Sequence, residues 1–196
     1  RHHLGMGAAR LLGRAFADHA PRGIGEHAAH ARVGLGHADG ARAAEVAMRA
    51  MLNEFWEMSR PLFDPEGFLH LTVGRAHEAV VALGQGLPPE IRPRATCALC
   101  LVQGSSAYWA HVGDSRVYQI RNGDVLARTR DHSHVELLLR EGLITEADVH
   151  GHPMRNFVEC CLGGDTNIPE MTIGRRQKLK PGDVIVEINH EKIGRA

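Results

Sequence analysis

The hydrophobic pattern of the chain changes character once, near Pro93, and this change sets the strongest limit on its fold. Upstream, apolar residues recur at steps of three and four, which predicts helices over 41–60 and 68–83. Downstream, short apolar runs alternate with turn residues, and Asn122-Gly123 between two such runs is a strong signal for a β-hairpin. The predicted strands cover 95–103, 107–112, 117–120, 125–129, 171–179 and 184–188, with short helices at 135–141 and from Thr145. Helices followed by an antiparallel meander predict a layered α+β fold.

The first forty residues carry weaker signals. Residues 6–19 place apolar side chains at helical spacing and are richer in arginine than in acidic residues. That pattern is typical of an amphipathic surface helix and also of an organelle presequence. Residues 21–40 are rich in Gly, His and Ala and poor in β-branched and aromatic side chains, which predicts a loop. We therefore divide the chain into an N-terminal segment, 1–20, and one domain, 21–196.

The charge balance limits the classes of partner. The 196 residues include 23 basic and 23 acidic side chains, so no positive excess is available to neutralise nucleic-acid phosphates. The apolar runs are far shorter than the roughly 18 residues that a membrane-spanning helix needs. We therefore expect neither a nucleic-acid partner nor a membrane partner.

The four cysteines predict free thiols rather than disulfides or a zinc site. Cys160 and Cys161 are adjacent, which does not suit a disulfide framework. Cys97 and Cys100 have the spacing of half a zinc knuckle, but they lie in a predicted strand, where residues three apart point to opposite faces. The pattern favours buried thiols and a reducing compartment, so we expect the protein to be cytoplasmic.

Several motifs in the second half follow one another in the order found in a known enzyme family. The matching runs are 111–118, which contains Gly-Asp-Ser-Arg, then 129–135, which contains Asp-His-Ser, and then 141–145, 152–156, 162–163 and 179–185. Over residues 95–186 the chain resembles the bacterial metal-dependent protein phosphatases of the PPM family, type 2C class. The resemblance implies an α+β fold with a two-layer antiparallel β-sandwich flanked by helices, incomplete at the C-terminus.

The resemblance also implies a chemistry. Members of this family hold Mn²⁺ or Mg²⁺ ions with aspartates and waters, and a metal-activated water attacks phosphoserine or phosphothreonine in a protein. The implied function is a protein serine/threonine phosphatase of bacterial signalling. Its substrate would be a phosphorylated protein, and a Ser/Thr kinase would be the opposing enzyme.

The family's functional positions fall on a mixed set of residues in this chain. Arg22 matches the arginine that binds phosphate, for which a guanidinium fork is well suited. Asp114 matches an aspartate that binds an additional metal in some members. His27 stands where the first metal-binding aspartate is expected, and His190 replaces the third. Asp39-Gly40 is one of two registers for the family's Asp-Gly metal loop.

The histidines at ligand positions leave three interpretations open. Imidazole prefers Zn²⁺, Cu²⁺ or Ni²⁺ over Mg²⁺, so His27, His37 and His190 would form an altered, softer site that takes Zn²⁺. In the second interpretation the centre is degenerate, and the chain is an inactive pseudophosphatase that binds phosphoproteins or another partner. In the third, the irregular ends represent damage to the sequence of an active enzyme.

Two further motifs have structural interpretations. Asp131-His132-Ser133 contains the residue types of a hydrolase triad, but adjacent side chains at the end of a strand diverge, and Ser133 suits a helix N-cap. Arg116, in the Gly-Asp-Ser-Arg motif, is expected to brace its turn through hydrogen bonds.

Overall fold

The computed structural model describes residues 27–35, 40–163 and 170–188, and for 27–35 the backbone only. The predicted N-terminal segment, 1–20, lies outside the described residues. The elements are β1 (His27–Leu35), α2 (Gly40–Glu57), α3 (Pro65–Leu83), the 3₁₀-helix η1 (Pro89–Ile91), β2 (Ala95–Gln103), β3 (Ser106–Val112), β4 (Arg116–Arg121), β5 (Asp124–Arg128), α4 (His134–Arg140), α5 (Glu146–Val149), β6 (Thr172–Ile173), β7 (Gln177–Lys178) and β8 (Val184–Ile188).

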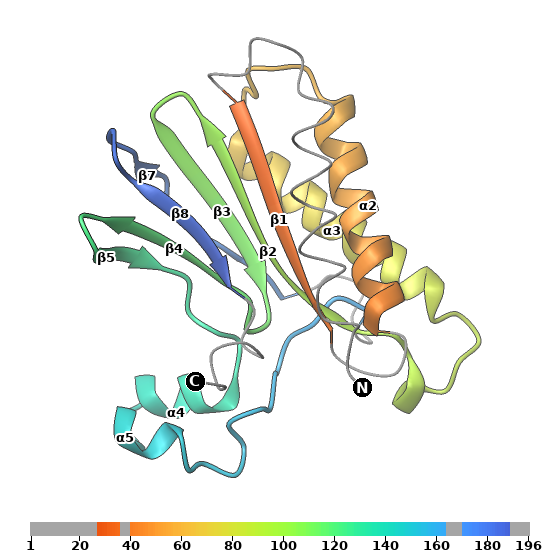
Figure 1. Ribbon diagram of the computed structural model, residues 1–196. Coiled ribbons are helices and arrows are strands. Elements are labelled where there is room, and N and C mark those ends of the chain that lie inside the picture. The colour runs from red at the N-terminus through yellow and green to blue at the C-terminus, as the bar shows by residue number, and fades with distance from the viewer. Residues whose placement is uncertain (1–26, 36–39, 164–169, 189–196) are drawn as a thin grey trace, which may run out of the picture.

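The described strands pair antiparallel throughout and form two sheets (Figure 1). The first sheet has the order β1-β2-β3-β6, with β7 also pairing with β3, and the second has the order β5-β4-β8. Helices α2 and α3 pack against each other and against the first sheet, on the side away from the second sheet. This arrangement confirms the predicted α+β fold, a two-layer antiparallel β-sandwich flanked by helices.

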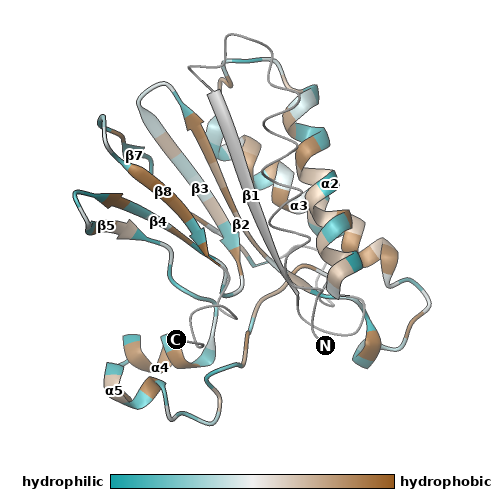
Figure 2. Cartoon of the chain, in the orientation of Figure 1, coloured by the Kyte–Doolittle hydropathy of each residue, from teal (hydrophilic) through white to brown (hydrophobic). Residues whose placement is uncertain are grey.

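Strand β2 supplies side chains to both layers of the core, because successive residues of a strand point to opposite faces. Cys97 and Leu99 join the buried cluster between the first sheet and the helices. Cys100 lies on the other face, where it packs with Trp109 and Val117 between the two sheets. Strand β2 is accordingly hydrophobic along most of its length (Figure 2), and its first seven residues are buried.

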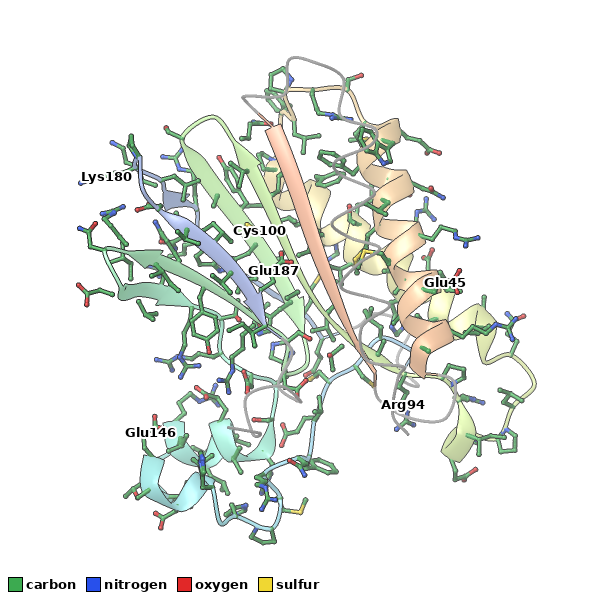
Figure 3. The ribbon with its side chains drawn as sticks, viewed as in Figure 1. Glu45, Arg94, Cys100, Glu146, Lys180 and Glu187 are labelled. Carbon is green, nitrogen blue, oxygen red and sulfur yellow. The ribbon has the colours of Figure 1, made fainter. Side chains whose placement is uncertain are left out.

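The thiols of Cys97 and Cys100 are free and buried, as the sequence predicts. Burial raises the pKa of each thiol to about 12. For Cys100, the carboxylate of Glu187, which lies nearby (Figure 3), is a second and smaller cause of this raised pKa. Because the two thiols point to opposite faces and stay protonated, they are neither a zinc knuckle nor nucleophiles at neutral pH.

Helix α3 begins three residues earlier than the hydrophobic pattern predicts, because Asp64 caps it. The Asp64 carboxylate accepts a hydrogen bond from the Gly67 amide at 2.9 Å, and Pro65 occupies the first helical position. Helix α2 is amphipathic and ends at Glu57. Across the described residues, no helix combines the length and the apolar character needed to cross a membrane.

The largest correction concerns residues 27–35, which form strand β1 instead of the predicted loop. This strand pairs with β2 along its whole length, from His27 opposite Gln103 to Leu35 opposite Ala95. The segment is rich in Ala and His, which have little intrinsic preference for strands. The hydrogen bonds offered by the neighbouring buried strand outweigh that weak local preference.

The second correction concerns residues 171–179, which form two short strands, β6 and β7, rather than one long strand. The interruption includes Gly174, whose amide donates to the Trp109 carbonyl at 2.8 Å. A Cβ atom at Gly174 would lie 2.1 Å from Nε1 of the Trp109 indole, so the backbone passes directly against this ring. The close approach ends regular pairing there.

Candidate functional site

One end of the sandwich gathers the ends of several strands. Strands β3 and β4 are joined by residues 113–115, the turn by which the chain passes from the first sheet to the second. Strand β1 ends at the same place, with Leu35 opposite Ala95, and β8 ends there with Ile188 opposite Arg116. Helix α2 also begins at this end (Figure 1). We call it the turn edge.

The turn itself is tightly constrained at Gly113. This residue has φ of +91°, a conformation that side chains with a Cβ rarely adopt. A Cβ there would lie 2.3 Å from Cγ2 of Thr96. The Thr96 hydroxyl also forms a buried hydrogen bond of 2.9 Å with the hydroxyl of Ser115. The residues on both sides of Asp114 are therefore fixed against strand β2.

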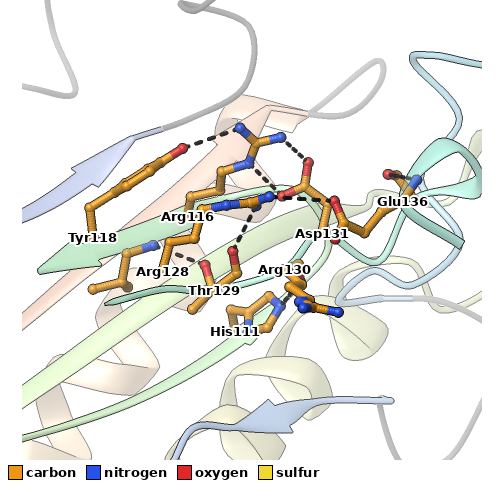
Figure 4. Close-up of polar contacts among 10 residues, drawn as sticks. His111, Arg116, Tyr118, Arg128, Thr129, Arg130, Asp131 and Glu136 are labelled. Carbon is orange, nitrogen blue, oxygen red and sulfur yellow. Dashed lines mark hydrogen bonds and ion pairs between the residues drawn. The ribbon is translucent and has the colours of Figure 1, made fainter. Parts of the chain in front are cut away.

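Arg116 braces the same turn through a bidentate ion pair with Asp131 (Figure 4). Both nitrogen–oxygen distances are 2.6 Å, and a third guanidinium nitrogen donates to the Tyr118 hydroxyl at 3.2 Å. The hydrogen bonds to Asp131 raise the pKa of Arg116 above its ordinary value. This confirms the predicted bracing role of Arg116 and ties strand β4 to the loop before α4.

The Asp131-His132-Ser133 sequence does not form a hydrolase triad. The Asp131 carboxylate is committed to Arg116, and the Ser133 hydroxyl accepts a hydrogen bond from the Glu136 amide at 3.4 Å. Ser133 is therefore the N-cap of α4, as predicted.

Sequence reasoning missed a pair of histidines beneath the turn. The rings of His111 and His132 lie 4.4 Å apart between centroids. Nε2 of His111 donates to the Arg130 carbonyl at 2.5 Å. Burial, and next the neighbouring His132, lower the pKa of His111 to about 4, and burial also lowers the pKa of His132. The two runs that contain these histidines, 111–118 and 129–135, are visible in the sequence. Only the folding of the sandwich brings the two rings together.

The lowered pKa of His111 predicts a loss of stability in mild acid. An unfolded histidine titrates near pH 6.5, whereas folded His111 stays neutral down to about pH 4. Between these values the unfolded state binds one more proton than the folded state. The free energy of unfolding should therefore decrease by roughly 1 kcal/mol for each unit by which the pH is lowered. Urea unfolding at several pH values between 7 and 4 measures this slope. The variant His111→Gln keeps a donor toward Arg130 but cannot titrate, so its slope should be shallower; an identical slope would refute the assignment.

Two of the predicted site residues lie at the turn edge. Gly40 is buried and is the first residue of α2, and Asp114 is half-buried within the turn. Arg22, Asp39 and His190 lie outside the described residues, so their predicted roles stay predictions.

The structure does not bring His27 to the turn edge, which corrects its expected position. His27 is the first residue of β1 and lies opposite Gln103, at the far end of the sheet. A nine-residue strand is about 26 Å long at 3.3 Å per residue. This error and the failure to predict β1 have the same cause. A loop over 21–40 would have allowed His27 to approach Asp114, whereas strand β1 holds it at the other end of the sheet.

Among the described residues, Asp114 is the predicted metal-binding carboxylate whose position can be compared with the metal centre that the resemblance implies. Asp114 offers a carboxylate, the kind of hard oxygen ligand that Mn²⁺ and Mg²⁺ prefer. Within the described part of the chain, no group of three or more His, Cys, Asp or Glu side chains is arranged to hold a metal ion. The described residues therefore offer one suitable carboxylate ligand, Asp114, but not a complete metal centre.

Comparison with known proteins gives one consistent group of relatives, although no family model matches the chain. A Streptococcus pyogenes protein named for the 2C type of protein phosphatase is 32% identical over 152 residues, which cover 77% of this chain and 61% of the relative. The crystal structure of the Mycobacterium tuberculosis serine/threonine phosphatase PstP/Ppp matches with a TM-score of 0.68 at 27% identity. That match covers 83% of this chain and 67% of the other. The chain thus spans about three fifths of the Streptococcus relative.

A further solved structure bears on the metal. The catalytic domain of the phosphatase PstP in complex with two manganese ions matches with a TM-score of 0.60 and 26% identity. The match covers 82% of this chain and 65% of that one. In that relative, the same fold accommodates a pair of divalent cations.

Proposed function

Because the chain belongs to the bacterial PPM family of type 2C protein phosphatases, we propose that it hydrolyses phosphoserine and phosphothreonine in proteins. The observation that carries the proposal is the turn of residues 113–115. It places Asp114 at one end of a sandwich of the family's fold, where the partly buried Arg116–Asp131 ion pair and the buried Thr96–Ser115 hydroxyl pair hold the backbone of the turn. A carboxylate with a fixed backbone at the meeting point of two sheets suits cation binding.

The chain's own residues have defined tasks in this proposal. Bound divalent metal ions would supply the activated water and neutralise charge on the phosphoryl group. Asp114 would provide an oxygen ligand to the metal, and Arg22 would hold the phosphate through its guanidinium group. We propose Mn²⁺ or Mg²⁺ as the metal, because the ligand described at the turn edge is a carboxylate. Zn²⁺ is the alternative that the imidazole of His190 would favour.

Turnover of p-nitrophenyl phosphate and of a phosphothreonine peptide tests the proposal. We expect hydrolysis that depends on Mn²⁺ or Mg²⁺ and is abolished by a chelator. Replacing Asp114 with alanine should lower kcat/KM by at least about tenfold, because a metal ligand is lost. Assays with Mn²⁺, Mg²⁺ and Zn²⁺ in parallel distinguish a hard metal centre from a soft one.

A matched control is Asp124→Ala, which removes an exposed carboxylate at the β4–β5 hairpin, away from the turn edge. This variant should keep the activity of the unmodified chain. If the chain turns over neither substrate with any of the three metals, and calorimetry detects no metal binding, the phosphatase proposal fails and the pseudophosphatase alternative takes its place. Equal activity of the Asp114→Ala and Asp124→Ala variants would remove Asp114 from the centre.

We further propose that the protein acts in the cytoplasm on phosphoproteins made by a Ser/Thr kinase. The support is that Cys97 and Cys100 are buried, protonated thiols, which suits a reducing compartment. Dephosphorylation of a proteome treated with a purified bacterial Ser/Thr kinase, followed by phosphopeptide mass spectrometry, would identify the substrates.

A further inference from the structure

The turn that carries Asp114 has a further support in His132. The Gly113 amide donates to Nδ1 of His132 at 3.3 Å. In return, the His132 amide donates to the Gly113 carbonyl at 2.9 Å. Both polar backbone groups of the residue before Asp114 are therefore satisfied by one neighbour.

His132 is itself held on three sides. Its Nε2 lies 2.8 Å from the Thr172 hydroxyl in β6, and its ring lies against His111 of β3. Its backbone carbonyl accepts a hydrogen bond of 2.8 Å from the Glu159 amide. The orientation of the ring is therefore set by two strands of the first sheet, not only by the loop to which His132 belongs.

The partners of the ring also define its tautomer. A backbone amide can only donate, so Nδ1 is the unprotonated acceptor and Nε2–H donates to Thr172. Burial lowers the pKa of His132 and favours this neutral ring, while the carboxylates of Glu170, Asp131 and Glu159 act in the opposite direction. The form that supports Gly113 is the neutral one with its proton on Nε2.

We propose that His132 is a positioning residue: by holding Gly113, it sets where the Asp114 carboxylate lies at the turn edge. Asp114 is followed by Ser115, which is bonded to Thr96, so both neighbours of the carboxylate are anchored. A ligand whose backbone is ordered in advance loses less entropy on binding a cation. The consequence for metal binding rests on the proposed function, whereas the consequence for the turn does not.

Two isosteric substitutions separate the roles of the two ring nitrogens. His132→Asn keeps an amide oxygen near the position of Nδ1, and His132→Gln places an amide near Nε2 but offers no acceptor to Gly113. We expect hydrogen exchange of the Gly113 amide to accelerate roughly five- to tenfold in His132→Gln and in His132→Ala, and to change by less than about twofold in His132→Asn. Exchange of the Val117 amide, which is bonded to Thr129, reports any global destabilisation. Equal Gly113 exchange in all variants and in the unmodified chain would overturn the proposal.

Calorimetric titration with Mn²⁺ tests the link to Asp114. We expect the Mn²⁺ affinity to fall roughly five- to tenfold in His132→Gln and to be retained in His132→Asn. Faster Gly113 exchange with unchanged Mn²⁺ affinity in His132→Gln would overturn the positioning role toward Asp114. If the unmodified chain binds no Mn²⁺, the proposed function fails, and the exchange measurement alone decides whether His132 holds the turn.

Discussion

Replacing Asp131 with alanine is expected to lower the free energy of unfolding by about 3 kcal/mol, because it leaves the Arg116 guanidinium partly buried without its anion. The Asp131 side chain is only 4% exposed and makes both short hydrogen bonds to Arg116. Arg116 keeps 20% of its side chain exposed, which places the expected loss at the lower end of the range for buried pairs. Urea unfolding followed by circular dichroism measures the change.

A surface ion pair of the same chain provides the control. Glu45 and Arg49 are paired at 2.8 Å on the outer side of α2, with 65% and 72% of their side chains exposed. Replacing Glu45 with alanine should change the free energy of unfolding by less than about 0.5 kcal/mol, because water screens the pair. The double replacement of Arg116 and Asp131 by apolar residues should recover part of the stability lost in Asp131→Ala. A loss below about 1 kcal/mol in the Asp131 variant would show that the pair does not stabilise the turn.

Replacing Gly113 with alanine is expected to cost about 3 kcal/mol of the free energy of unfolding. Roughly 1–2 kcal/mol comes from placing a Cβ on a residue with positive φ. The remainder comes from the contact with Thr96, whose Cγ2 and Cβ would lie 2.3 Å and 2.6 Å from the new atom. Because Thr96 belongs to a buried strand, neither side of the contact can move far.

Gly123→Ala isolates the backbone contribution to this effect. Gly123 has φ of +92°, nearly the value at Gly113, but no atom lies within 4 Å of the position that its Cβ would occupy. The Gly123 variant should therefore lose only about 1–2 kcal/mol. The difference between the two variants measures the steric cost at the turn. Equal losses would mean that the Thr96 contact relaxes, and the turn would then be less rigid than its geometry indicates.

Local signals predicted most of the second half of the chain. Asn122 and Gly123 both have positive φ, as a tight hairpin between β4 and β5 requires. The opposite directions of Cys97 and Cys100 followed from strand geometry alone. These features depend on residues close together in the sequence, where backbone preferences and the period of two act directly.

Features that depend on distant partners were the ones the sequence could not predict. Strand β1 forms because β2 pairs with it. An Ala- and His-rich segment does not by itself predict a strand. The wrong position of His27 followed from that omission. Motif order did locate Asp114 in the turn, but the contact between His111 and His132 depends on how residues 21 positions apart pack in the folded sandwich.

The hydrogen bonds that connect Gly113, His132 and Glu159 have a consequence for the order of folding. They join three segments that are separated in the sequence: the bonds between Gly113 and His132 need the β3–β4 turn to meet the loop before α4, and the bond from Glu159 needs the loop after α5 to meet both. Contacts of this kind are expected to form after the rate-limiting barrier. Substitutions at these residues should then leave the refolding rate nearly unchanged and act mainly by accelerating unfolding. The hydrogen bonds of Gly113, His132 and Glu159 would therefore determine the lifetime of the native state rather than the rate at which it forms.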